Sequence, residues 1–436
     1  MPAGPFAPGH LGELTRIVSF DLVDAALENS RAVERRVRLL PSRVVVYLLL
    51  AAALFAELGY EQVWARLTAG LDGIDIADPV SSALAQARRR IGVKPLRELF
   101  NLVQGPAAGA ARWRGLLVCA IDGTSMFTPD TPANLAAFGR GGGGNGPSGY
   151  PMLRVLTVVA CGTRTVLDAV FGTLSVGETN YAPKLLGCLH PGMLLLADRN
   201  FAAADLIEAV AATGADLLFR AKANRKVPVI GHCSDGSWLS RIGPTTVRVI
   251  DAQILVRLAG GPPRTERYLL ITTLTDHRRY PAADLVTLYH QRWEIETSYL
   301  EMKSTILGGR VLRARTPDGI AQEIYALLIT YQALRIAISD ATGTATTNRA
   351  SFSIALNTAR DQVIQAAGII ADTTIDFIGK IGHAVRDHLL PERRRRTCPR
   401  VVKRAISKHR AKGDIDRNSY KITIDVTING QLTTGP

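Results

Sequence analysis

Several features are scarce in this sequence. Its 436 residues include only five cysteines, and no two of them form the Cys-x-x-Cys pair typical of structural zinc sites. The most apolar run, residues 44–56, is too short to cross a bilayer and is followed by Glu57. The first residues show no basic stretch followed by an apolar run, as a secretory signal would. We therefore expect neither a structural zinc site nor a membrane span, but a cytoplasmic protein with reduced thiols and access to nucleoid DNA.

Acidic residues are also in deficit, and nucleotide-binding motifs are missing. The chain has 38 Asp and Glu against 52 Lys and Arg, a formal net charge of +14, which favours a polyanionic partner such as DNA. Between Pro391 and Lys412 ten basic residues stand beside one acid, so this basic tail is expected to make nonspecific phosphate contacts. The glycine-rich stretch 141–149 is not followed by Gly-Lys-Ser/Thr, and it predicts a flexible connection between strands rather than a phosphate cradle.

The N-terminal quarter of the chain has the periodicity of helices. Two short helices are expected at residues 60–71 and 78–92, the second with Asp78 as its N-cap. The second helix is basic, because it carries Arg88, Arg89 and Arg90. Such a pair suits a helix-turn-helix-like reader in which these arginines contact DNA, and it suits equally well a plain helical bundle with a charged outer face.

From Leu116 the periodicity becomes that of strands. Short apolar runs rich in strand formers alternate with a helical stretch at residues 202–214, which predicts an α/β core with a mixed sheet. A long hairpin pattern without a helical one predicts a β-rich insertion in that core. The predicted segments are a helical N-terminal DNA-binding domain, the first part of the core, the insertion, the second part of the core, and a helical and basic C-terminal region: 1–110, 111–222, 223–278, 279–345 and 346–436.

The most specific motif lies in residues 282–307, a stretch without proline or glycine that predicts a helix. At about 100° per residue, its residues Tyr289, Arg292, Glu296 and Lys303 fall within roughly 60° of one another on one helical face. A phenol, a guanidinium, a carboxylate and an ammonium are poor material for a core, but together they suit a phosphodiester and a metal ion.

The same helical period separates the neighbouring carboxylates. Glu294 and Glu301 point roughly 140–160° away from Glu296, so that only Glu296 shares a face with the two cations of the motif. Trp293 lies about 60° from Glu296, close enough to flank a site. The alternative is an amphipathic helix whose charges are solvated and whose Trp293 lies in the core.

Two aspartates earlier in the chain could complete a site. Asp122 and Asp198 each follow an apolar run that predicts a buried strand, at the edge of the sheet where open α/β folds bind ligands. Each aspartate could instead be a turn former, since Asp122-Gly123 is ordinary turn chemistry. With Glu296 they make three carboxylates, which would repel one another unless divalent cations lay between them.

Carboxylate oxygens suit Mg²⁺, or Mn²⁺ as a substitute, rather than zinc. Two such ions about 4 Å apart could activate an attacking oxygen and stabilise the leaving oxygen of an in-line phosphoryl transfer. DNA phosphates would then be held by the other members of the motif, Tyr289, Arg292 and Lys303.

In these residues the chain resembles the DDE transposases of bacterial insertion sequences, specifically the insertion-sequence-four family. The resemblance covers roughly residues 20–345, and the 98 residues from Asp198 to Glu296 leave room for the β-rich insertion of that family. It is carried by Asp122 in AIDGT, Asp198 in LLLADRNF, and a Tyr-x2-Arg-x3-Glu-x6-Lys signature at Tyr289, Arg292, Glu296 and Lys303. One departure is that Arg199-Asn200-Phe201 follows Asp198, with no acid close behind.

The resemblance implies an RNase H-like catalytic core in which Mg²⁺ is held by Asp122, Asp198 and Glu296. It implies cut-and-paste transposition, in which water frees a 3′-hydroxyl at an element end and this hydroxyl attacks target DNA. The implied partners are double-stranded DNA, as terminal inverted repeats and as target, and a second copy of the chain in a homodimer on DNA. Some relatives hold a flipped base with a tryptophan, for which Trp293 is the candidate.

Two other functions are compatible with the same residues. One is a catalytically inactive, transposase-derived DNA-binding protein or repressor, which the basic tail and the arginines of residues 88–90 would support. The other is a host RNase H-like nuclease, which would cut without preference for repeat ends.

Overall fold

The computed structural model describes residues 7–34, 36, 38–71, 73, 75–143, 146–258, 264–366, 378–391, 422–428 and 431–433. The chain forms two compact units. The first unit comprises Met1–Ala111, Gly123–Gly177 and Glu296–Glu392, and the second comprises Arg112–Asp122, Glu178–Ile295 and Arg393–Pro436. Each unit thus combines segments that are far apart in the sequence. Strand β2 (Leu116–Phe127) begins in the second unit and ends in the first.

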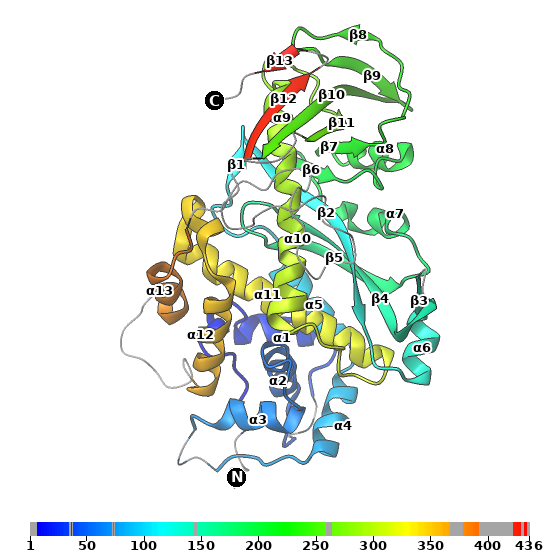
Figure 1. Cartoon of the computed structure of the whole chain (residues 1–436). Coiled ribbons are helices and arrows are strands. Elements are labelled where there is room, and N and C mark those ends of the chain that lie inside the picture. Colours follow the sequence, from blue (N-terminus) through cyan, green and yellow to red (C-terminus); the bar gives the residue numbers. More distant parts are fainter. Residues whose placement is uncertain are drawn as a thin grey trace. The chain divides into compact units, whose positions relative to one another are not determined.

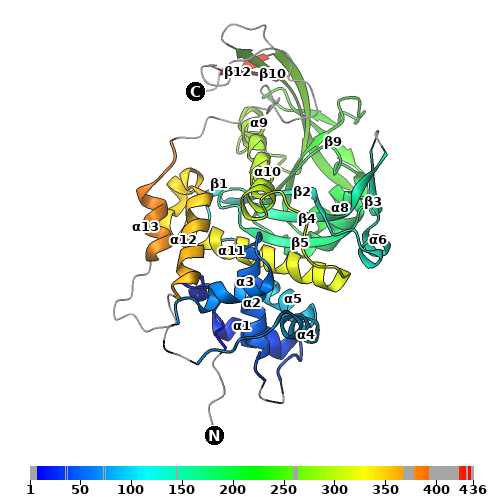
Figure 2. The same cartoon turned by 60° about the horizontal axis from the view of Figure 1, so that its bottom comes forward.

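The first unit is built around two buried helices. The long helix α11 (Pro317–Thr346) bends at Gly343, where φ is 62°. Helix α2 (Ser42–Leu54) is apolar on every side, as a core helix should be, and lies beside α11 in both views (Figure 1, Figure 2). The buried helix expected from the apolar run is therefore present. The other helices of this unit include α1 (Phe20–Asn29), α3 (Tyr60–Thr68), α4 (Ser81–Ile91), α5 (Lys94–Val103), α6 (Pro132–Phe138), α12 (Phe352–Ile364) and α13 (Gly379–Asp387).

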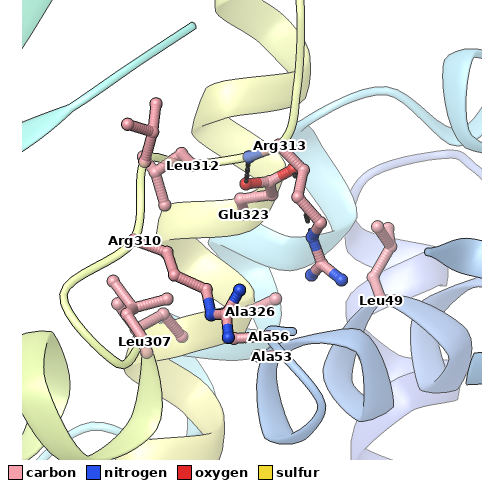
Figure 3. Close-up of a pocket in the computed structure, with 11 residues that line it drawn as sticks. Leu49, Ala53, Ala56, Leu307, Arg310, Leu312, Arg313, Glu323 and Ala326 are labelled. Carbon is pink, nitrogen blue, oxygen red and sulfur yellow. Dashed lines mark hydrogen bonds and ion pairs between the residues drawn. The ribbon is translucent and has the colours of Figure 1, made fainter. Parts of the chain in front are cut away.

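Arg313 joins α2 to α11 at the wall of a small pocket (Figure 3). Its guanidinium donates hydrogen bonds to the carbonyls of Ala52 (2.6 Å) and Leu58 (2.7 Å). Ala52 lies in the last turn of α2 and Leu58 in the turn that follows it, where helix carbonyls lack intrahelical partners and a cation is favoured. The backbone N–H of Arg313 donates to the Glu323 carboxylate of α11 at 2.8 Å. Burial raises the pKa of Glu323, and the Arg313 charge opposes that rise.

Helices α3 and α4 do not form a helix-turn-helix pair. α3 ends at Thr68 and α4 begins at Ser81, a connection much longer than the roughly 3–4 residues of that motif. The N-cap of α4 is Val80 and not the predicted Asp78. The helix begins there because the backbone N–H groups of Ala83 and Leu84 donate to the carbonyl of Val80, at 2.9 and 3.2 Å. The carbonyl of Ala77 accepts instead from the Trp64 indole at 2.9 Å.

Two of the three arginines on α4 are engaged within the first unit. The Arg88 guanidinium lies 3.7 Å from the centre of the Tyr60 ring, and Arg90 forms an ion pair with Glu34 at 2.9 Å. These contacts favour the helical-bundle interpretation of this region. Arg89 is exposed and stays our proposed DNA contact on this helix.

The strands of the first unit form a sheet beside the C-terminal part of β2. β2 neighbours β4 (Gly146–Ala160), which pairs in antiparallel fashion with β3 (Arg140–Gly143) and with β5 (Val166–Thr173). The glycine-rich stretch lies in the β3–β4 hairpin, with Gly143 opposite Gly146, and residues 144–145 fall outside the described part of the chain. This arrangement agrees with the expected connection between strands.

The second unit contains a mixed sheet. β6 (Met193–Ala197) runs parallel to both β2 and β7 (Asp216–Ala221), and β7 pairs in antiparallel fashion with β11 (Arg264–Thr272). The strand order is β13-β12-β10-β11-β7-β6-β2. The remaining elements are β1 (Arg112–Trp113), β8 (Gly231–His232), β9 (Trp238–Ile242), β10 (Thr245–Leu258), β12 (Ile422–Ile428), β13 (Gln431–Thr433), α7 (Glu178–Tyr181), α8 (Ala204–Ala212) and α9 (Ala282–Tyr289).

The expected β-rich insertion is formed by β8 to β11, and a buried arginine ties it to α9. Arg248 of β10 is fully buried and forms an ion pair with Asp235. It also donates to the Ser237 hydroxyl (2.7 Å) and to the carbonyl of Tyr280 (2.6 Å), just before α9. Asp235 in turn accepts from the backbone N–H of Ala282, the first residue of α9 (2.9 Å). The insertion therefore fixes the start of the helix that carries Tyr289.

The C-terminal region also supplies a strand to the sheet. β12 pairs in antiparallel fashion with β10 and so extends the sheet of the second unit. Residues 392–421, which hold nearly all of the basic tail, lie outside the described residues, and the expected phosphate contacts of that tail stay a prediction.

The expected fold class is confirmed: a mixed α/β core with a β-rich insertion follows an all-helical N-terminal region. In the described part of the chain, no helix has the length and apolar character that crossing a membrane requires.

Candidate active site

The sequence predicted Asp122 at the end of a strand, but it lies inside β2. The strand is buried from Leu116 to Ile121 and only half-buried from Asp122 onwards, so the apolar run ends where the carboxylate begins. The strand itself continues to Phe127, because pairing with β4 needs backbone hydrogen bonds and no apolar side chains. Asp122 therefore projects from a strand that is held by its neighbours.

Asp198 follows β6 directly and closes a tight turn. Its carboxylate accepts a hydrogen bond from the backbone N–H of Asn200 at 2.8 Å, and its carbonyl accepts from Phe201 at 3.2 Å. The Phe201 side chain is completely buried and anchors the turn. The turn-forming interpretation is thus correct for Asp198, and it is compatible with a role in a site because the carboxylate stays half-buried.

The register of β2 and β6 brings the two aspartates to the same level. Each pair from Leu117↔Met193 to Ala120↔Leu196 is separated by 76 residues in the sequence, and so are Asp122 and Asp198. Continuing this parallel register by two residues places Asp122 beside Asp198. Neighbouring strands lie about 4.8 Å apart, and residues at the same level point to the same face. The register thus predicts that the two carboxylates lie close together at one edge of the second unit.

Tyr289, Arg292, Glu296 and Lys303 are called the tetrad below. Two members of the tetrad contact Asp122 or the residue before Asp198 within the second unit. Nη1 of Arg292 lies 3.2 Å from Oδ2 of Asp122. The phenol of Tyr289 donates to the carbonyl of Ala197, the residue before Asp198, at 3.1 Å. Tyr289 is only 2% exposed, so its burial favours a positioning role over the phosphate contact expected from the sequence.

Trp293 and Arg292 lie against each other at the end of a 3-10 turn. The turn η3 (His290–Arg292) follows α9, and α10 (Trp293–Leu300) begins directly after it. The Arg292 guanidinium lies 5.3 Å from the centre of the half-buried Trp293 ring. Such a cation–π contact holds the guanidinium near the Asp122 carboxylate.

The other two members of the tetrad belong to the first unit. Glu296 is half-buried in α10, and Lys303 lies in a π-helical turn, η4 (Glu301–Ile306). The Lys303 ammonium donates to the Thr124 hydroxyl at 3.0 Å, and burial lowers the pKa of Lys303. Thr124 stands two residues after Asp122 on β2 and so shares its face of the strand. Thr124 was not singled out from the sequence, although its spacing from Asp122 was a usable signal.

The estimate that all four side chains lie within roughly 60° on a regular helix needs correction. A 3-10 turn precedes α10 and a π turn follows it, and these turns contain about three and more than four residues per turn, respectively. Lys303 is consequently displaced from the angle that a continuous α-helix would give it. The choice of Glu296 over Glu301 agrees with the structure, because Glu301 is buried and pairs with Arg164 at 2.9 Å.

The oxygen donors at this edge fit a divalent cation by type. Asp122 and Asp198 supply carboxylates at adjacent positions, and the positive charge of Arg292 already compensates one of them. Among the described residues, no group of three or more His, Cys, Asp or Glu side chains is arranged so that it could hold a metal ion. The pair of aspartates is thus the part of the expected ligand set that the second unit provides.

A tyrosine pair in the same helical stretch gives a direct test of positioning. We expect Tyr289→Phe to lower the rate of DNA cleavage at saturating DNA by roughly ten-fold, because losing the bond to Ala197 lets the neighbouring Asp198 shift. DNA affinity should not change, since the phenol is buried. Single-turnover cleavage and fluorescence anisotropy measure the two quantities.

The control is Tyr299→Phe. It removes another buried phenol, which bonds to the Thr157 hydroxyl at 2.9 Å. A net loss of about 1 kcal/mol of stability is expected for both variants. Equal cleavage rates for the two variants would refute the positioning role of Tyr289.

Two known protein families match the sequence segments that contain the predicted site residues. The insertion element 4 transposase N-terminal family matches residues 8–101, and the transposase DDE domain family matches residues 113–333. The chain is 27% identical over 397 residues to transposase InsG for insertion sequence element IS4 of Escherichia coli K12, which covers 88% of this chain and 90% of that protein. It is 31% identical over 132 residues to the putative transposase InsZ of the same strain, which covers 29% of this chain and 44% of that protein.

A solved structure is also similar, the piggyBac transposase synaptic complex with hairpin DNA. The TM-score is 0.44 and the identity 12%, with 87% of this chain and 84% of that chain covered. The family matches span the helical region, the RNase H-like core with both aspartates, and the tetrad helix. The chain therefore belongs to the IS4 family of DDE transposases.

Proposed function

We propose that the chain cuts DNA at the ends of its own insertion element and joins the freed 3′ ends to target DNA, by cut-and-paste transposition. The single observation that carries the proposal is the β2–β6 register, in which a 76-residue offset brings Asp122 to the level of Asp198. Two carboxylates at the carboxyl end of a parallel strand pair are a suitable start for a divalent-cation site.

Glu296 is proposed as the third acid. It stands four residues after Arg292, whose guanidinium contacts Asp122. With Asp122 and Asp198 it would hold Mg²⁺ or Mn²⁺, two ions per site. When bound, these ions supply activation of the attacking oxygen and stabilisation of the leaving oxygen.

The cations and the tryptophan around the acids have separate proposed roles. Arg292 holds the Asp122 carboxylate in place and, with Lys303, balances the negative charge of an approaching phosphodiester. Lys303 donates to Thr124, which keeps the ammonium close to the strand that carries Asp122. Trp293 is half-buried beside Arg292 and is the proposed platform for an unstacked base.

We further propose that two copies act together on paired element ends, in the cytoplasm where nucleoid DNA is accessible. The formal net charge of +14 supports the DNA part of this proposal. Arg89 and the basic tail are the proposed backbone contacts outside the catalytic core.

The test is cleavage of a duplex that carries the inverted repeats flanking the gene. With Mg²⁺ we expect a nick at the repeat end, and with a chelator or a shuffled repeat sequence we expect at least a hundred-fold less product, in line with the loss of several kcal/mol of metal-derived stabilisation. Equal cutting of repeat and shuffled duplexes would instead indicate a general nuclease. Binding without any nicking would indicate a repressor.

A further inference from the structure

A pocket on the second unit adjoins Asp198 and has no role in the chemistry described above. It has a volume of about 380 Å³ and is lined by Arg199, Asn200, Ala202, Ala203, Lys222, Asn224 and Arg225. Three of these side chains are cationic and none is acidic. The pocket lies within a single unit, so its shape does not depend on the other.

The topology explains why the cations gather there. β6 and β7 are parallel, with Ala197 opposite Phe219, so that their carboxyl ends open on the same edge of the sheet. Arg199 comes from the turn after β6 and Lys222 is the first residue after β7. Ligands of open α/β sheets bind at this edge, just beyond the carboxyl ends of the strands.

The two ends of the pocket are held differently. Arg225 is half-buried, and its guanidinium donates to the carbonyl of Ala202, while its backbone N–H donates to the carbonyl of Lys222 at 2.9 Å. This turn fixes the loop after β7 against the segment that leads into α8. Arg199 and Lys222 are exposed, and neither forms an ion pair with any carboxylate in the described part of the chain. Their charges are therefore available to a ligand.

We propose that this pocket binds a backbone phosphate of the DNA strand that passes Asp198. The inference rests on the proposed function only in taking DNA as the substrate. Arg199 follows Asp198 immediately, so a phosphate held here belongs to a nucleotide close to the one being cut. Asn200 and Asn224 add amide donors, and the volume is large enough for a phosphate with part of its sugar. The positive pocket also offsets the repulsion between the DNA and the paired aspartates.

The chemistry points to a phosphodiester and leaves two sources, the element end and the target DNA. Their affinities are compared with two duplexes, one carrying the repeat that flanks the gene and one of shuffled sequence, in Ca²⁺ or without a metal so that no cleavage occurs. The variants are Arg199→Gln, Lys222→Gln and the double variant. Arg241→Gln is the control, because Arg241 is an exposed cation of β9 in the same unit that does not line the pocket.

The readout is the slope of log binding constant against log salt concentration. The double variant should reduce the magnitude of this slope by about 0.9, since one phosphate contact is lost, and each single variant should reduce it by a part of that amount. A change on the repeat duplex alone assigns the pocket to the element end, and a change on both duplexes assigns it to DNA in general, target included. Slopes equal to those of wild type and Arg241→Gln on both duplexes would overturn the proposal.

The test of the pocket and the test of the proposed function can fail independently of each other. A wild-type protein that cuts repeat ends, with variants whose salt slopes are unchanged, refutes the pocket and leaves the transposase assignment intact. A wild-type protein that cuts nothing, with variants whose slopes fall, leaves the pocket intact. Thermal unfolding curves of the variants should match wild type, because both side chains are exposed.

Discussion

Replacing Glu296 with glutamine is expected to lower Mg²⁺-dependent cleavage of repeat-end DNA by at least about a thousand-fold. Glutamine keeps the size of the side chain but offers a weaker, neutral ligand to a divalent cation. The loss of one metal ligand should cost several kcal/mol of transition-state stabilisation, and each 1.4 kcal/mol is about ten-fold in rate. Asp122→Asn and Asp198→Asn should lose as much. Single-turnover cleavage of a labelled duplex measures the effect.

The matched control is Glu294→Gln on the same helix. It removes the same charge two residues earlier, at a position that the helical period turns roughly 160° away from Glu296. We expect its cleavage rate to stay within about two-fold of wild type, because its carboxylate does not share the helical face of Glu296. DNA affinity measured without metal should be at least as high for Glu296→Gln as for wild type, because the variant removes a negative charge from the DNA-binding face. If Glu296→Gln cut as fast as Glu294→Gln, the assignment of the third acid would be wrong.

The residue types of the site could be predicted from the sequence, whereas their packing could not. The spacing of Tyr289, Arg292, Glu296 and Lys303 depends only on the helical period, and this is a local property of the chain. The period does not say which part of a helix is buried. Tyr289 is thus buried, bonded to the end of β6 and in contact with the Tyr268 ring of the insertion.

The interruptions of the tetrad helix also escape sequence analysis. The residues of the 3-10 and π turns contain no proline or glycine, so no local signal marks either turn. The Lys303 ammonium of the π turn bonds to Thr124 of a distant strand, a contact that no local pattern reveals. Likewise, the extent of β2 beyond Asp122 depends on a strand partner, and the long connection between α3 and α4 has no local signal.

The sequence separation of the two aspartates equals the separation of the residues that pair between β2 and β6. A 76-residue offset separates Asp122 from Asp198 and also separates the paired residues of β2 and β6. The separation of the aspartates is read from the sequence, whereas the separation of the paired residues is known only from the sheet. Their agreement predicts that the two aspartates are neighbours.

Replacing Glu301 with glutamine should greatly lower the free energy of unfolding, whereas Glu296→Gln is expected to lower the cleavage rate. Glu301 is 5% exposed, and its carboxylate accepts from Arg164 (2.9 Å) and from the Tyr331 phenol (2.9 Å). Arg335 lies 3.8 Å from the same carboxylate. Glutamine would remove the negative charge that faces two buried guanidinium groups. Breaking a buried ion pair in this way costs about 3–5 kcal/mol.

The backbone at Arg164 adds to the expected effect. Arg164 has a φ of 59°, a left-handed conformation that is costly for a residue with a side chain, in the turn between β4 and β5. The ion pair with Glu301 helps to hold this residue in place, so its loss should loosen the turn as well. Guanidinium denaturation followed by circular dichroism should show a clearly lower midpoint for Glu301→Gln than for wild type.

Tyr331→Phe is the control for Glu301→Gln, because it removes one hydrogen bond from Glu301 and leaves both charges paired. Burial and then the Glu301 charge raise the pKa of Tyr331, so its phenol is a neutral donor and its removal should cost only about 1 kcal/mol. An order of stability of wild type, then Tyr331→Phe, then Glu301→Gln follows from the charges. If Glu301→Gln unfolded at the wild-type midpoint, the buried pair would contribute nothing. The two glutamates of one helical stretch would then differ only in what they do for catalysis, and not in what they do for the fold.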